Sequence, residues 1–124
     1  MAVPKYFEMY HAFLTCLADG REHTIAESNA YVIDSFHLTE ADLAQLQPSG
    51  NQGLFSNRMG WCGTYLSNAG CIERAARSVY RITDRGMALI EQYSIIDDDV
   101  LMQFPEFVAF KKSKGKKKQL RNPE

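Results

Sequence analysis

The strongest constraint on the fold is the spacing of apolar residues between positions 54 and 69. Five apolar side chains recur there at steps of four, three, four and three: Phe55, Met59, Cys62, Leu66 and Ala69. At about 100° per residue these positions share one face of a helix, and that face needs burial. The sequence therefore predicts an amphipathic helix over residues 54–69, which Gly70 ends.

Three shorter helices are expected before this one, over residues 4–17, 24–36 and 39–47. Pro4 fits the first turn of a helix, and apolar residues from position 6 to position 17 follow it at helical spacing. Thr24 and Glu27 have the spacing of a capping box, and Thr39 is suited to begin the third segment. The chain is therefore expected to be mainly helical before residue 70.

A small β-hairpin is expected next, with strands over residues 71–74 and 78–83 joined by Ala75, Ala76 and Arg77. Thr83 is suited to cap a last helix over residues 84–93. This order predicts a winged helix-turn-helix, a fold that is mainly α with a small β-hairpin (α+β). In such domains the later helix enters the DNA major groove, and the hairpin, or wing, contacts the backbone or a minor groove.

We expect the winged-helix domain to occupy residues 1–96 and a C-terminal extension over residues 97–110 to pack on it. Residues 111–124 hold six Lys and one Arg with one aliphatic residue, which predicts a basic disordered tail or linker. That segment either adds non-specific affinity for nucleic acid or only solubilises the chain. The run Asp97-Asp98-Asp99 indicates a surface turn or a helix cap, because adjacent carboxylates point in different directions.

The net charge of −1 conceals an uneven distribution along the chain. Residues 1–50 carry two basic and seven acidic groups (−5), whereas residues 51–96 and 97–124 each sum to +2. Such a chain makes a polarised molecule. No apolar run approaches the roughly 20 residues that span a bilayer, and the N-terminus lacks the pattern of a signal peptide. Three widely spaced cysteines favour a reducing compartment, so we expect a cytoplasmic protein without membrane attachment.

Catalysis, metal binding and cofactor binding are not expected from the sequence. His11, His23 and His37 share no zinc-type spacing with the cysteines, for which packing is the default role. A nucleophile needs an activating base and an oxyanion site, and no recognisable spacing supplies them. The glycines at positions 50 and 53 lack the Lys and the preceding strand of a phosphate-binding loop.

Three segments resemble the N-terminal domain of Mrr-type restriction endonucleases. They are Pro48-Ser-Gly-Asn-Gln52, then Phe55-Ser-Asn-Arg-Met-Gly-Trp-Cys-Gly-Thr-Tyr-Leu-Ser-Asn-Ala-Gly70, then Tyr80-Arg-Ile-Thr-Asp-Arg-Gly86. The resemblance covers roughly residues 2–110 and implies a winged helix that recognises DNA, often modified DNA, in a restriction or defence system. A separate nuclease domain normally follows in that family. We expect this chain to lack that domain, and to be either a stand-alone relative or an excised targeting domain that binds without cutting.

The helix over residues 54–69 is the expected recognition helix for double-stranded DNA. Asn57 and Asn68 suit an adenine edge, and Arg58 suits guanine or phosphate. Trp61 and Thr64 suit a thymine methyl group or a methylated base, while Gln52 and Ser56 lie near the helix start for phosphate. The alternative is that Trp61 packs against the wing and the polar side chains are merely solvated.

The wing supplies the other expected contacts, since Arg74, Arg77 and Arg81 can hold the DNA backbone. The alternative is a solvated hairpin. The wing also departs from the family, whose members commonly have Arg-Gly where this chain has Arg77-Ser78.

Two other functions stay open. One is a protein-interaction module that docks a nuclease domain or forms a homodimer, which the acidic first half favours. The other is a small transcriptional regulator.

Overall fold

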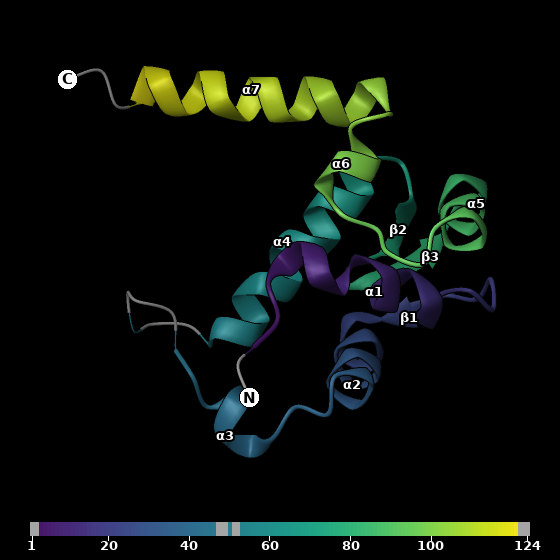
Figure 1. Cartoon of the computed structure of the whole chain (residues 1–124), viewed down its shortest axis with the longest axis vertical. Coiled ribbons are helices and arrows are strands. Elements are labelled where there is room, and N and C mark those ends of the chain that lie inside the picture. Colours follow the sequence, from purple (N-terminus) through teal and green to yellow (C-terminus); the bar gives the residue numbers. More distant parts are fainter. Residues whose placement is uncertain (1–2, 47–49, 51–52, 122–124) are drawn as a thin grey trace.

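The fold comes from a computed structural model, which describes residues 3–46, 50 and 53–121; side chains are described to residue 113. Seven α-helices, one 3-10 helix and three strands follow one another in this part of the chain (Figure 1). In order they are η1 (Tyr6–Met9), α1 (Tyr10–Cys16), β1 (His23–Thr24), α2 (Ile25–Ser35), α3 (Glu40–Leu43), α4 (Leu54–Asn68), β2 (Ile72–Ala76), β3 (Val79–Ile82), α5 (Asp84–Gln92), α6 (Asp98–Leu101) and α7 (Pro105–Arg121).

The predicted capping residues begin three of the helices. Thr24 caps α2 and accepts a hydrogen bond from the Glu27 amide at 3.1 Å, while the Glu27 carboxylate accepts from the Thr24 amide at 3.0 Å. Thr39 caps α3 in the same reciprocal way with Asp42. The Thr83 hydroxyl accepts from the Gly86 amide at the start of α5. These bonds satisfy amides that the first helical turn leaves unpaired, so they fix where each helix begins.

The five-residue apolar face predicted for α4 is buried, as expected. It packs against η1 and α1, and α1 in turn packs against α2 and α5. Tyr10, Phe13 and Leu14 of α1 are fully buried at this junction. The core therefore lies around α1, and α4 turns its opposite face away from it.

The sheet is antiparallel with the strand order β1-β3-β2, so the molecule has an α+β, winged-helix-like fold. Strand β1 was not expected, because two residues are too few to show alternation. The three-residue turn expected at 75–77 is wrong: β2 runs to Ala76, and Arg77 and Ser78 make the turn. A bulge between Arg74 and Ala76 and a left-handed Ser78 (φ 59°) allow the shorter connection.

The segment after α5 returns to the core. Leu101 and Phe107 are fully buried, and Asp97 caps α6, as the sequence indicated for the acidic run. The Asp98 carboxylate accepts hydrogen bonds from the hydroxyls of Tyr6 at 2.5 Å and Tyr10 at 2.6 Å. Burial of the Tyr10 hydroxyl is the main cause of its raised pKa, and the hydrogen bond to Asp98 raises the pKa further. The protonated hydroxyl therefore ties this segment to α1.

Helix α7 extends past the position at which the sequence predicts a disordered tail or linker. It continues through Arg121, and its far end projects away from the other elements (Figure 1). Lys, Gln, Leu and Arg all have high helix propensity, which compensates for the lack of apolar periodicity there. The proposed division of the chain at residues 96 and 110 stays a prediction. None of the helices within the described ranges has the length and apolarity to cross a membrane.

Candidate nucleic-acid interface

The face of α4 opposite the core carries five of the ten residues predicted to meet DNA. Ser56, Thr64 and Asn68 are exposed, and Asn57 is half-buried. The Asn68 amide donates to the Thr64 carbonyl at 2.8 Å, one turn back along the helix. Gln52, predicted for the helix start, lies outside the described residues. The structure thus brings these four predicted side chains to one helix.

Trp61 is the largest side chain on this face, and 40% of it is exposed. Its ring meets that of Tyr65 edge to face, with centroids 5.9 Å apart. Tyr65 in turn contacts Phe107 and Phe110 of α7 at 5.8 and 5.5 Å. Aromatic contacts of this kind hold ring orientation. Trp61 is therefore supported from one side by a row of rings that continues into α7.

Lys111 was not among the predicted site residues, because the sequence placed it at the start of a tail. Its ammonium lies 5.0 Å from the ring centroid of Tyr65 and 5.9 Å from that of Phe107. Cation–π attraction at such distances holds a lysine over a ring. The sequence does carry one signal of this contact. The apolar run from Phe104 to Phe110 indicates that this segment packs onto the domain.

The two interior glycines of α4 differ in their surroundings. A Cβ at Gly63 would lie 3.6 and 3.8 Å from ring atoms of Phe13, at ordinary contact distance in the core. A Cβ at Gly60 would meet nothing within 4 Å, and Gly60 is exposed. A glycine in a helix interior costs roughly 0.5–1 kcal/mol relative to alanine. At Gly60, no described neighbour is close enough to require a glycine in place of an alanine.

Arg58 has a structural contact that spacing did not predict. Its Nη1 donates to the carbonyl of Val3 at 2.7 Å and to that of Pro4 at 3.3 Å. Val3 is buried, so the guanidinium holds the first described residues against α4. The contact joins residues 55 positions apart, which no local pattern reveals. The predicted contact of Arg58 with guanine or phosphate stays a prediction.

We expect Arg58→Met to destabilise the domain by about 1.5–3 kcal/mol, the range for hydrogen bonds from charged groups. Methionine retains much of the apolar stem but donates to neither carbonyl. Urea denaturation followed by circular dichroism measures the change. Ser56→Ala, an exposed change on the same helix, is the control and should unfold at the wild-type midpoint. Equal midpoints for Arg58→Met and wild type would show that the two carbonyl contacts contribute nothing to stability.

The three wing arginines divide into two groups. Arg81 donates to the Glu73 carboxylate at 2.6 and 3.0 Å and reaches Glu22 at 3.5 Å. Arg74 and Arg77 are exposed, and neither has a hydrogen bond or ion pair with another described residue. Glu73 lies opposite Arg81 in the β2–β3 register, so strand pairing sets this ion pair. Only Arg74 and Arg77 present uncompensated positive charge on the wing.

Two of the three cysteines have the buried positions expected of packing residues. Cys62 and Cys71 are buried, and burial raises the pKa of both thiols, that of Cys71 to about 12. A protonated thiol is neither a nucleophile nor a metal ligand. Within residues 3–46, 50 and 53–113, no group of three His, Cys, Asp or Glu side chains is arranged to hold a metal ion.

Comparison with known protein families identifies a relationship for most of the chain. The family model described as the Mrr N-terminal domain matches residues 6–92. This range takes in every element from η1 to α5 and leaves α6 and α7 outside. It confirms the family expected from the sequence. No curated protein and no solved structure matches the chain.

Proposed function

Because this chain belongs to the family of Mrr N-terminal domains, we propose that it binds double-stranded DNA through the outer face of α4 and the wing. Family membership indicates a defence-related role in a restriction system. The matched domain is not itself the nuclease domain. In our proposal the domain recognises a target, including a modified base, and does not cut it.

The observation that carries the proposal is the combination of a mixed polar and aromatic helix face with two unpaired wing arginines. Amide and hydroxyl groups on α4 suit base edges and phosphates, and the exposed Trp61 ring suits a methyl group. Arg74 and Arg77 suit phosphate because no carboxylate among the described residues neutralises them. Arg81 is already paired with Glu73, so its phosphate contact would have to compete with that ion pair.

Fluorescence anisotropy with labelled duplexes, methylated and unmethylated, tests the proposal across a salt series. Binding to phosphate predicts that log K falls with log salt by about 0.9 for each phosphate contact. Absence of binding by the wild-type chain even at low salt would refute DNA binding. A methyl-dependent difference in affinity would identify modification as part of what is recognised.

The wing contacts have their own prediction. Arg74→Glu and Arg77→Glu should each weaken DNA binding and lower the salt slope by about 0.9, because each removes one released counterion. Arg21→Glu is the matched control: it is an exposed arginine before β1, at the sheet edge opposite β2. It makes the same change in net charge. If all three variants lose affinity equally, net charge rather than wing contact accounts for the loss.

A further inference from the structure

A groove runs along η1 and α1, and no residue of α4 or of the wing is among those that line it. Two adjoining hollows of about 390 and 400 Å³ share Glu8, His11 and Phe36. A smaller hollow continues from the second one, sharing Phe7 and Asp97 with it. The three hollows form one continuous surface, which we call the α1 groove.

The α1 groove combines apolar side chains with carboxylates. Ile95 is 76% exposed and Tyr31 is 39% exposed, although both are large apolar or aromatic residues. Glu8, Asp97 and Asp99 lie along the groove, and none of its described lining residues is Lys or Arg. Phosphate groups would be repelled here, so the groove suits a protein surface that is apolar and basic.

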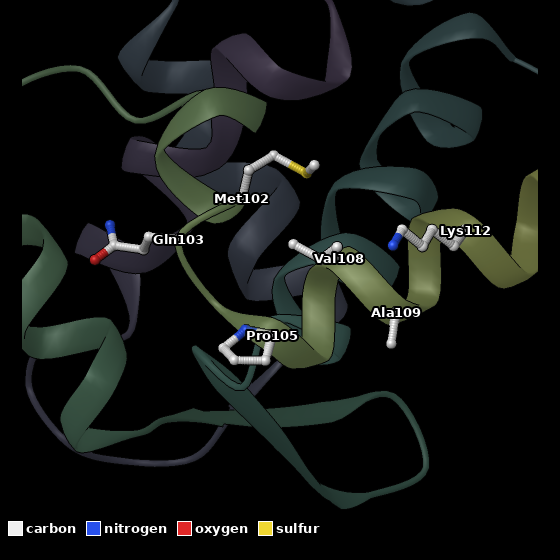
Figure 2. Close-up of a pocket in the computed structure, with 6 residues that line it drawn as sticks. All are labelled: Met102, Gln103, Pro105, Val108, Ala109 and Lys112. Carbon is white, nitrogen blue, oxygen red and sulfur yellow. The ribbon is translucent and has the colours of Figure 1, made fainter.

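The junction of α6 and α7 presents such a surface. Met102, which is 42% exposed, lies beside a hollow of about 460 Å³ with Pro105, Val108, Ala109 and Lys112. Figure 2 shows Pro105, Val108, Ala109 and Lys112 along α7, with Met102 on the turn that follows α6. No carboxylate is among the described residues that line this hollow. We call it the α7 face.

We propose that the chain self-associates, with the α7 face of one copy seated in the α1 groove of a second copy. Met102 and Val108 would cover Ile95 and Phe36, and Lys112 would meet the Asp97 and Asp99 carboxylates. Both surfaces are apolar and their charges are opposite, which favours this pairing over like-with-like contact. The α7 face lies outside the residues that the family model matches. The inference does not depend on DNA binding.

The pairing is heterologous, because two different surfaces meet. Two copies can close into a dimer if each places its α7 face in the groove of the other; otherwise association continues to larger species. Every copy carries one groove and one face. A copy with a damaged groove therefore still offers an intact α7 face to another copy, and this property gives a selective test.

Sedimentation velocity of the full chain, from low to high micromolar concentration at low salt, tests the proposal. Wild type should show a concentration-dependent sedimentation coefficient that falls at high salt. Ile95→Asp and Ala109→Glu should each raise the dissociation constant by about tenfold or more, because each places a new carboxylate in the contact. Leu46→Asp is the control for Ile95→Asp, since Leu46 is 59% exposed and lines neither surface. It should associate like wild type.

Mixing the two damaged variants gives the decisive result. Ile95→Asp and Ala109→Glu should each sediment as monomers, yet their equimolar mixture should associate through the intact face of one and the intact groove of the other. A wild-type chain that stays monomeric would overturn the proposal. So would association that survives Ile95→Asp, or a mixture that remains monomeric. Circular dichroism melting of each variant confirms that it is folded.

Discussion

Gly86→Ala is expected to destabilise the domain by about 3 kcal/mol or more, enough to remove a large share of its stability. Gly86 is the third residue of α5 and is buried against the start of the sheet. An added Cβ would overlap the carbonyl oxygen of Cys71 and would lie 2.8 Å from Cγ1 of Ile82. Real Cβ atoms do not approach other atoms so closely, so either α5 or the backbone at Cys71 would have to move.

Neither α5 nor the backbone at Cys71 can move without losing hydrogen bonds. The same Cys71 carbonyl accepts from the Thr83 amide at 3.0 Å. The Thr83 hydroxyl donates to the Gly70 carbonyl at 2.6 Å and accepts from the Gly86 amide at 3.2 Å. A shift of α5 away from Cys71 therefore breaks the cap and the link to the end of α4. Unmade bonds at buried groups each cost about 1–3 kcal/mol, which supports the size of the predicted effect.

Thermal and urea denaturation of Gly86→Ala measure this cost. Gly63→Ala is the matched control, because it is another buried helical glycine whose Cβ would find ordinary contact distances. It should unfold close to the wild-type midpoint. A Gly86→Ala protein with the wild-type midpoint would contradict the close approach of α5 to Cys71.

The position of α4 and the starts of α2, α3 and α5 were predictable from the sequence because their causes are local. The apolar steps of α4 and the Thr caps of α2, α3 and α5 depend on residues within one or two turns. Strand β1 and the two-residue wing turn were missed, since pairing with β3 and a left-handed serine decide them. Neither cause leaves a short-range pattern in the chain.

The candidate site was predictable only as a set of residues on one helix and one hairpin. Some of these side chains already form hydrogen bonds or ion pairs within the protein. Which ones do so depends on contacts between segments that are far apart in the sequence. Arg58 is held by Val3 and Pro4, and Arg81 by Glu73 and Glu22, through separations of up to 59 residues. Sequence spacing could not separate these two arginines from Arg74 and Arg77. Tertiary packing therefore refines the prediction from four arginines to the two that lack a partner among the described residues.

Gly60→Ala is expected to stabilise the domain by about 0.5–1 kcal/mol and yet weaken DNA binding by about tenfold or more. Alanine fits at this position, because nothing described lies within 4 Å of its Cβ. The glycine is therefore unfavourable for the free protein. If α4 enters the major groove, Gly60 lets the helix backbone come close to a base edge or phosphate beside Trp61 and Thr64. A methyl group there would hold the helix away from its hydrogen-bonding partners.

Anisotropy titration of Gly60→Ala and Gly63→Ala, with melting curves for both, separates the two effects. Gly63 is buried and its Cβ would contact Phe13 in the core, so its replacement should leave DNA affinity unchanged. Wild-type affinity in Gly60→Ala would mean that the closest approach of DNA lies elsewhere on α4, while DNA binding by the wild-type chain would stand. Loss of affinity together with gained stability would instead show that Gly60 serves a ligand, since a folding role predicts that the two change in the same direction.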